Sequence, residues 1–276
     1  MRRRNGSTIR SAGVEGHGTL AAANMPAAPI RLLVIPAAGR GSRLGWAGPK
    51  ALCPVAGRPM IQFVLDRYAA FVHRSVIVVA PDAALAFRRA LRTRARSLEY
   101  VEQAEPTGML PAVLCARAAV EAHQPEEVWV TWCDQVAISD GTARRLAVEM
   151  DGHHEAALVF PTVRQSPPYI HFVRDAQSRI SGVLQRREGD AMPPAGESDA
   201  GLFGMRWRTY LDDLTEFSRT APASDGTRER NFLPFIPWLA GRAVVRTFEV
   251  TDAREAAGVN TPEDLRAFEA GFGGRR

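Results

Sequence analysis

Residues 33–44 constrain the fold more than any other part of the chain. They begin as an apolar run, which predicts a buried parallel strand, and they end in a turn that holds Gly39 and Gly41. Glycine accepts backbone angles that are closed to other residues, so such a turn can bring main-chain N–H groups close to a ligand. Arg43 and Lys50 follow and supply cationic donors for phosphate. The segment therefore predicts a nucleoside triphosphate site at the carboxyl edge of a sheet.

Three other nucleotide-binding motifs do not fit this segment. The dinucleotide fingerprint requires a third glycine where the chain has Leu44. The Walker A loop requires Gly-Lys-Ser/Thr, whereas Lys50 stands between Pro49 and Ala51. The protein-kinase glycine loop requires a further lysine strand and a His-Arg-Asp loop, and the sequence contains neither. A turn that only links a strand to a helix would explain the two glycines. It would not explain why Arg43 and the Pro49-Lys50 pair follow them at the spacing of a phosphate-binding loop.

Strands and helices alternate through the first half of the chain. Apolar runs at 75–80, 98–103 and 128–132 follow the first one, and helical segments separate them. One of these helices begins after Pro59, and another covers about 110–123. Short connections in this alternation predict a parallel, doubly wound sheet with right-handed crossovers. We therefore expect an α/β protein with a Rossmann-like, mostly parallel sheet.

The second half of the chain has a different pattern of predicted elements. With it, we expect the sheet to be mixed. Its predicted elements are short and are separated by proline- and glycine-rich turns: strands at 155–161, 169–174, 179–184, 202–206 and 243–250, and helical segments near 207–217 and 229–240. Residues 188–200 form a long polar loop of the kind that serves as a lid or a link. Thr261, followed by Pro262, is expected to cap a last helix.

One catalytic domain is expected over residues 29–276, preceded by a separate tail at residues 1–28. The tail is rich in arginine, glycine, alanine and serine without periodicity, so we expect it to be disordered or to precede a natural start at Met25. The net charge of +5 is concentrated there, because residues 1–24 hold four arginines and one glutamate. The rest of the chain is nearly neutral and does not predict nucleic-acid binding.

Other aspects of composition exclude several classes of protein. No apolar stretch is long enough to cross a bilayer, and the tail lacks the apolar core of a secretory signal. The three cysteines, Cys53, Cys115 and Cys133, do not have the spacing of metal ligands. Unpaired thiols are typical of a cytoplasmic protein. We expect a cytoplasmic protein without membrane or nucleic-acid partners, and the sequence is compatible with a homo-oligomer.

Asp134 and Asn260 are oxygen donors at positions where a metal could bind. Asp134 follows the strand at 128–132, at the edge where doubly wound folds bind ligands. Mg²⁺ prefers one or two carboxylates beside phosphate oxygens and water. Taken alone, Asp134 could equally cap a helix, and Asn260 could be a turn residue. In nucleotidyl transfer the attacking phosphate is already an anion, so cations and a metal would carry the catalysis.

These residues together resemble the signature of the sugar-1-phosphate nucleotidyltransferases. The chain is most similar to the uridylyltransferase domains that make UDP-N-acetylglucosamine, and the resemblance runs from about residue 31 to residue 265. It implies that Arg43 steadies the outgoing pyrophosphate and Lys50 the reacting phosphates. It also implies that Asp134 and Asn260 hold Mg²⁺. The nucleotide-binding residues that it implies are Ala37, Ala38, Gly39, Gly41, Gln103 and Gly108.

The acceptor half of the chain departs from that family. The family's Gly-Asp pair reads Cys133-Asp134, and its base-loop Gly-Thr reads Gly108-Met109. The acceptor-binding residues implied by the resemblance are Tyr169, Gln185, Arg186 and Asp199, where the family has Tyr-Gly, Glu-Lys and Asn-Thr-Gly. A polar mismatch in such a pocket can shift specificity ~10⁴-fold or more. The expected partners are therefore an NTP, with UTP favoured, and a sugar or sugar-like 1-phosphate other than N-acetylglucosamine 1-phosphate.

Two alternatives remain open at this stage. The first is a cytidylyltransferase-type enzyme that acts on an alcohol phosphate or a phosphonate. The second is a regulator that binds nucleotide sugars without catalysis, which the presence of Arg43, Lys50, Asp134 and Asn260 argues against.

Overall fold

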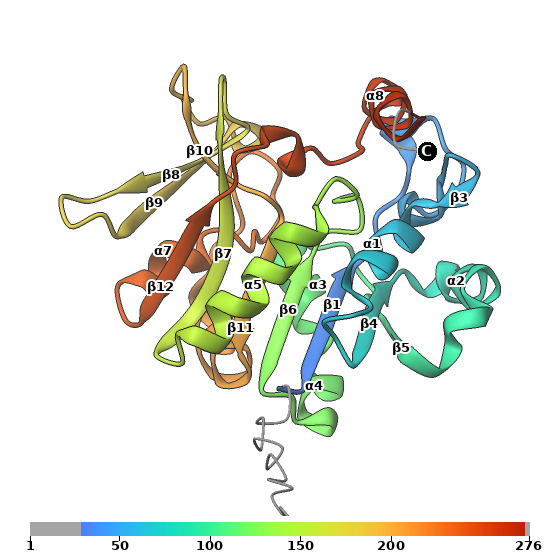
Figure 1. Cartoon of the computed structure of the whole chain (residues 1–276), viewed down its shortest axis with the longest axis horizontal. Helices are drawn as coiled ribbons and strands as arrows, with labels where there is room; N and C mark the ends of the chain where they lie inside the picture. Colours follow the sequence, from blue (N-terminus) through green and yellow to red (C-terminus); the bar gives the residue numbers. More distant parts are fainter. Residues whose placement is uncertain (1–28, 274–276) are drawn as a thin grey trace, which may run out of the picture.

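The computed structural model describes residues 29–273, so the predicted tail at 1–28 lies outside the described residues. A central sheet of eight strands runs in the order β10-β7-β11-β6-β1-β4-β5, with β12 paired to β7 (Figure 1). Its strands are β1 (Arg31–Pro36), β4 (Arg74–Val79), β5 (Leu98–Glu102), β6 (Glu127–Thr131), β7 (Ala156–Gln165), β10 (Gly196–Asp199), β11 (Leu202–Arg206) and β12 (Val244–Glu249).

The sheet changes direction between β6 and β11. The strands β6, β1, β4 and β5 are all parallel to one another, as the strand–helix alternation predicts. By contrast, β11 is antiparallel to both β6 and β7, and β10 is antiparallel to β7. The mixed, mostly parallel α/β sheet expected from the sequence is confirmed.

Helices cover both faces of the sheet (Figure 1). They are α1 (Met60–Tyr68), α2 (Ala84–Ala90), α3 (Met109–Leu114), α4 (Arg117–His123), α5 (Asp140–Gly152), α6 (Leu214–Thr220), α7 (Phe235–Ala240) and α8 (Pro262–Gly273). Side chains of β1 alternate between two cores: Leu33 and Ile35 pack with α1 and α5, while Leu32 and Val34 pack with α3, α4 and α7. Among residues 29–273, no helix has the length and apolar character to cross a membrane.

Two small sheets and several short helices complete the fold. The strands β2 (Pro54–Val55) and β3 (Arg58–Pro59) pair, and β8 (Ile170–Arg174) pairs with β9 (Ile180–Gln185) in a hairpin that projects from the sheet (Figure 1). The single-turn helices are η1 (Ser42–Leu44), η2 (Lys50–Leu52), η3 (Pro81–Ala83), η5 (Arg186–Glu188) and η7 (Ala253–Ala256), with a longer 3₁₀ segment η4 (Arg92–Ser97) and a π-helical turn η6 (Thr209–Asp213).

Three predicted elements differ from those observed. The loop predicted at 188–200 ends in β10, whose polar residues hide the strand pattern because each finds a partner: Ser198, for example, donates a hydrogen bond to Gln165. The helix predicted at 110–123 is divided into α3 and α4 by a tighter turn in which the Ala116 N–H donates to the Val113 carbonyl. The helix predicted at 229–240 begins only at Phe235, after Pro234.

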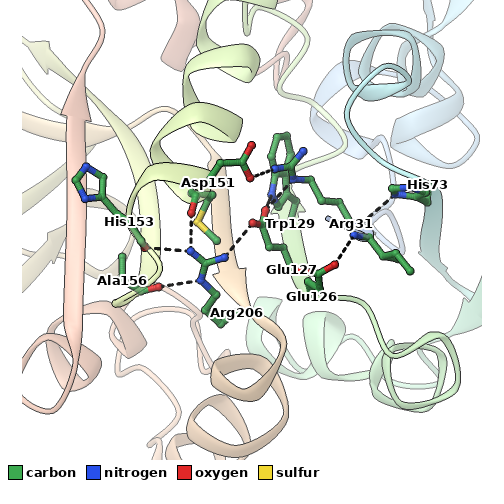
Figure 2. Close-up of polar contacts among 11 residues, drawn as sticks. Arg31, His73, Glu126, Glu127, Trp129, Asp151, His153, Ala156 and Arg206 are labelled. Carbon is green, nitrogen blue, oxygen red and sulfur yellow. Dashed lines mark hydrogen bonds and ion pairs between the residues drawn. The ribbon is translucent and has the colours of Figure 1, made fainter. Parts of the chain in front are cut away.

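A buried ion network joins the amino ends of β1 and β6 to the carboxyl end of the antiparallel strand β11 (Figure 2). The fully buried carboxylate of Glu127 accepts hydrogen bonds from Arg31 Nε at 2.8 Å, Arg206 Nη1 at 3.0 Å and Trp129 Nε1 at 3.1 Å. The guanidinium of Arg31 also contacts Asp151 on α5. Because every charge in the network has a partner, it fixes the junction where the sheet turns antiparallel, at the edge opposite the carboxyl ends of β1 and β6.

Candidate functional site

A cleft of about 820 Å³ opens where the carboxyl ends of β1 and β6 meet the loops around β8, β9 and β10. Its walls come from the glycine-rich loop, the segment after β5, the end of β6, the β8–β9 hairpin and the segment before α8. Of the residues predicted to form the site, the following line it: Ala38, Gly39, Arg43, Lys50, Gln103, Gly108, Asp134, Tyr169, Gln185, Asp199 and Asn260. Ala37, Gly41 and Arg186 do not. A site at this edge is where open α/β sheets bind ligands.

The glycine-rich loop is held by main-chain hydrogen bonds. The Ala37 N–H donates to the Val78 carbonyl at 2.7 Å, so it is not available to a base. The Gly41 N–H donates to the Gly48 carbonyl at 3.3 Å, and the Lys50 N–H donates to the Gly39 carbonyl at 3.0 Å. These bonds fold the loop back on itself and present Lys50 to the cleft.

Gly41 serves close packing and not an unusual backbone angle. The prediction that Gly39 and Gly41 would use backbone angles closed to other residues finds no support, because neither is among the described glycines with positive φ. A Cβ atom at Gly41 would lie 3.0 Å from Cβ of Trp46, whose indole also covers Gly48. The loop therefore needs small residues because Trp46 packs across it.

Four predicted residues meet at one point in the cleft. The Lys50 ammonium contacts the Asp134 carboxylate and lies 2.7 Å from Asn260 Oδ1. Arg43 Nη2 lies 3.4 Å from the same Asn260 oxygen. The side chains of Lys50 and Asp134 are each only 14% exposed, so this pair is weakly screened by solvent.

The chain brings Asp134 and Asn260 together through its backbone. The Val259 N–H donates to the Asp134 carbonyl at 3.1 Å, which ties the turn before α8 to the end of β6. Thr261 caps α8 as predicted, since the Asp264 N–H donates to its hydroxyl at 3.2 Å. The Asp264 carboxylate accepts in return from the Asn260 and Thr261 N–H groups. These bonds hold the Asn260 backbone, and the side-chain amide of Asn260 donates to the Gly258 carbonyl at 3.3 Å.

This donor set fits a divalent cation. The Asp134 carboxylate and the Asn260 amide oxygen already share one cation, the Lys50 ammonium, and hard oxygen donors of this kind suit Mg²⁺. A Cβ atom at Gly258 would lie 3.2 Å from Asp134 Oδ2, so glycine at this position keeps the space beside the carboxylate free. No cluster of three or more histidine, cysteine or acidic side chains suited to a metal occurs within residues 29–273. A metal here would therefore depend on few protein ligands and on phosphate oxygens.

Cys133, which stands where the family has glycine, is an inert neighbour of this cluster. Burial raises the pKa of its thiol to about 12, and the adjacent Asp134 carboxylate adds to the effect. The thiol is therefore protonated near neutral pH and does not compete for a hard cation.

The segment after β5 forms a second wall of the cleft, in the half that the sequence predicts to bind the nucleotide and that we call the nucleotide half. Gln103 is 7% exposed, and its Nε2 donates to the Gly108 carbonyl at 3.3 Å. Gly108 has a φ of 125°, an angle that favours glycine. This bond closes residues 103–108 into a compact loop. We call residues 103–110 the base loop.

Two neighbouring arginines differ in position in the half of the cleft that the sequence predicts to bind the acceptor, which we call the acceptor half. The Arg186 guanidinium donates to the Pro168 carbonyl at 3.0 Å and does not line the cleft, whereas Arg187 and Glu188 do. The prediction of Arg186 as an acceptor-binding side chain thus finds no support in the geometry. The single turn η5 places Arg187 and Glu188 at the cleft. Sequence reasoning missed both residues, and the only signal that could have found them is that they follow the predicted pair Gln185-Arg186.

Asp199 is a buried carboxyl group at the same end of the cleft. Burial raises its pKa from 3.8 to about 6, although the Gly201 N–H, which donates to Oδ1 at 2.8 Å, acts in the opposite direction. Glu229 and Asn231 also line this end, and the sequence had placed both in a helix. The acceptor half is therefore rich in hydrogen-bonding groups with few free cations.

Comparison with known proteins agrees with this geometry. Residues 33–195 match the model of the MobA-like NTP transferase domain. The bifunctional protein GlmU of Kineococcus radiotolerans is 27% identical over 247 residues, which cover 89% of this chain and 49% of that protein. GlmU of Pseudomonas paraeruginosa is 29% identical over 233 residues, covering 83% of this chain and 48% of the relative. The chain thus spans about half the length of these curated relatives.

A solved structure shares the fold. CMP:2-keto-3-deoxy-manno-octonic acid synthetase in complex with CTP superposes with a TM-score of 0.65 at 18% sequence identity, covering 90% of this chain and all of that chain. The family match spans more than half of the described chain, and the sheet, the glycine-rich loop and the cleft are consistent with it. The chain therefore belongs to the MobA-like NTP transferase domain family and is a nucleotidyltransferase, the class predicted from its sequence.

Proposed function

We propose that the chain transfers a nucleotidyl group from an NTP, with UTP favoured, to the phosphate of a sugar or sugar-like 1-phosphate. An acceptor phosphate oxygen forms a bond to the α-phosphorus of the NTP. The bond from that phosphorus to the bridging oxygen breaks, and pyrophosphate leaves with the electron pair. The observation that carries the proposal is the meeting of Lys50, Arg43, Asp134 and Asn260 at the carboxyl edge of the sheet.

Two of the four residues would neutralise negative charge in the reaction directly, and the other two would do so through a bound metal. Asp134 and Asn260 would hold Mg²⁺, which when bound supplies Lewis-acid stabilisation of the phosphates. Lys50 faces the same point and stabilises negative charge on the reacting phosphates, while Arg43 offers a planar guanidinium to the leaving pyrophosphate. No general base is required, because the nucleophile is an anion before it reacts.

The acceptor half supports a substrate other than N-acetylglucosamine 1-phosphate. Gln185 and Asp199 line the cleft in place of the residues typical of the uridylyltransferases, and the side chain of Ile170 occupies the position of a glycine. Each exchange alters hydrogen bonding or volume at the acceptor, and hydrogen-bonding sites reject mismatched substrates strongly. UTP is favoured over CTP because the signature residues of the chain resemble those of the uridylyltransferases.

A pyrophosphate-release assay with Mg²⁺ tests the proposal. The four NTPs and dTTP are crossed with a panel of sugar 1-phosphates, phosphocholine and phosphonates, and each active pair is repeated with Lys50→Ala and Asp134→Ala. Release that depends on one sugar 1-phosphate supports the proposal. Release with CTP and an alcohol phosphate or phosphonate alone would replace it with the cytidylyltransferase alternative, and binding of nucleotide sugar without release would favour the regulator.

The cytoplasmic location and any homo-oligomer remain predictions. The three cysteines are unpaired, which is the state expected in a reducing compartment.

A further inference from the structure

One loop segment reaches both halves of the cleft. Residues 224–231, which we call the strap, run between α6 and α7, and Glu229 and Asn231 of the strap line the cleft. The strap contacts the base loop and also residues 185–190, which comprise the end of β9 and the turn after it. We call residues 185–190 the acceptor loop.

Main-chain contacts join the strap to the base loop. The Arg230 N–H donates to the Thr107 carbonyl at 2.9 Å, and the Leu110 N–H donates to the Arg230 carbonyl at 3.0 Å. A Cβ atom at Gly108 would lie 2.5 Å from both the nitrogen and the oxygen of Arg230. The two backbones are thus packed against each other without intervening side chains, so a shift of Arg230 must move the base loop.

Side-chain contacts join the strap to the acceptor loop. The Glu188 carboxylate accepts from the Thr227 N–H at 3.0 Å, from the Thr227 hydroxyl at 3.0 Å and from the Asn231 amide at 2.9 Å. Arg187 Nη2 and Glu229 Oε1 form a second tie at 2.8 Å. The Glu188 carboxylate therefore holds two separate positions of the strap at once.

The Glu188 carboxylate is suited to this role by its charge. Partial burial acts to raise its pKa, but hydrogen bonds from Ser224, Asn231 and Thr227 outweigh this and hold the pKa below its ordinary value. Hydrogen bonds to an ionised acceptor are shorter and stronger than neutral ones. Beyond the strap, the buried ring of Phe232 packs on Trp132 and Phe203, which fixes the strap at its carboxyl end.

We propose that Glu188 is a positioning residue for the nucleotide as well as the acceptor, because the strap that it anchors couples the acceptor loop to the base loop. This proposal rests on the function proposed above, which assigns the base loop to the nucleotide and the acceptor loop to the acceptor. The coupling follows a continuous series of contacts. Glu188 binds Thr227 and Asn231 of the strap. Arg230, next to Asn231, binds Thr107 and Leu110 through its main chain.

Hydrogen exchange tests the coupling without any ligand. In Glu188→Ala, the amides of Leu110 and Arg230 are expected to exchange about tenfold faster than in the unsubstituted protein, because the strap has lost its anchor. The control is Arg179→Ala, which removes an exposed ion pair with Asp175 at the far end of the β8–β9 hairpin. Unchanged exchange at residues 107–110 in Glu188→Ala would overturn the inference. A uniform rise across the whole sheet would also overturn it, since that pattern indicates general destabilisation.

Binding and kinetics then separate positioning from direct contact. Calorimetric titration with UTP and Mg²⁺, with CTP in parallel, is expected to show a Kd about tenfold weaker in Glu188→Ala than in the unsubstituted protein. In the pyrophosphate assay the KM for the nucleotide and the KM for the acceptor both rise, and Thr227→Ala added to Glu188→Ala has little further effect. A rise in the acceptor KM alone, with UTP binding intact, would make Glu188 an acceptor contact only.

Failure of the proposed function is distinguishable from failure of this inference. If no nucleotide and acceptor pair releases pyrophosphate, the proposed function fails, but the exchange of Leu110 and Arg230 in Glu188→Ala still decides whether the strap couples the loops.

Discussion

The Lys50 ammonium contacts the Asp134 carboxylate, although the two residues are separated by 84 positions in the sequence. Lys50 reaches this point from the turn after the glycine-rich loop, and Asp134 from the end of β6. The pair, with Asn260 Oδ1 at 2.7 Å from the ammonium, places a cation between two oxygen donors at the edge where phosphates would bind. The chemistry proposed for the cleft depends on this arrangement.

Removing either partner should reduce turnover strongly. We expect Lys50→Ala and Asp134→Ala each to lower kcat by ~10²-fold or more, because loss of one preorganised electrostatic contact typically has that effect. Steady-state pyrophosphate release measures this, with thermal denaturation as a check on folding. Arg179→Ala serves as the matched surface control. Near-normal kcat in both Lys50→Ala and Asp134→Ala would show that the reaction takes place elsewhere.

The same pair predicts an effect on metal binding in the absence of turnover. Lys50 shares two oxygens with the position proposed for Mg²⁺, so Lys50→Ala should tighten the binding of Mn²⁺, used as a probe, by about tenfold at low ionic strength. Asp134→Asn should weaken it by a similar or larger factor. Electron paramagnetic resonance of free Mn²⁺ gives both values without nucleotide. Equal Mn²⁺ affinity in Asp134→Asn and the unsubstituted protein would contradict the assignment of Asp134 as a ligand.

The Asp199 carboxyl group should make stability depend on pH. Its folded pKa of about 6 lies above the ordinary value of 3.8, so between these values the folded state binds more protons than the unfolded state. The free energy of unfolding therefore falls as pH rises through this window and stays lower above it. Asp199→Asn removes the penalty and should stabilise the protein by about 1–3 kcal/mol at pH 8, and this difference should vanish below the unfolded pKa of 3.8.

Urea denaturation at a series of pH values measures this difference. If Asp199→Asn and the unsubstituted protein are equally stable at both ends of the series, Asp199 does not have the raised pKa of a buried carboxyl group. Ser198→Ala is a control for the pH dependence: it removes hydrogen bonds at the neighbouring position without changing the charge, so the stability that it costs should be the same at both ends of the series.

The buried Glu127 network should contribute to stability and not to catalysis. Glu127→Ala leaves Arg31 and Arg206 without their shared partner, and breaking such a buried arrangement typically costs about 3–5 kcal/mol. Glu127→Gln should cost less because its amide oxygen still accepts. Urea unfolding measures both. Since the network lies at the edge opposite the cleft, KM for the nucleotide should be unchanged in Glu127→Gln. A raised KM there would show that the two edges are coupled.

Much of the nucleotide half could be predicted because its signals are local. The apolar runs of β1, β4 and β6 are buried on both faces and read as continuous hydrophobic segments. The spacing from the glycine-rich turn to Lys50 is short, so the chain has few ways to present that side chain. Cap residues at Thr261 and Pro262 likewise fix the start of α8.

The acceptor half could not be predicted to the same depth because its elements are defined by partners distant in sequence. The polar strand β10 pairs with β7, and its Ser198 and Glu197 side chains find Gln165 and Arg174 as partners. One turn of helix decides that Arg187 lines the cleft and Arg186 does not. No pattern within 185–190 distinguishes these two arginines.

By itself, the sequence determined the α/β class, the glycine-rich loop and the identity of the charged residues that a phosphate site requires, since each depends on neighbours within a few positions. Tertiary structure alone decided that Lys50, Asp134 and Asn260 share one point, that Trp46 is the reason for Gly41, and that residues 224–231 join the two halves of the cleft. The physical reason is that such contacts form between segments whose separation along the chain carries no periodic signal, and only the packed sheet brings them within hydrogen-bonding distance.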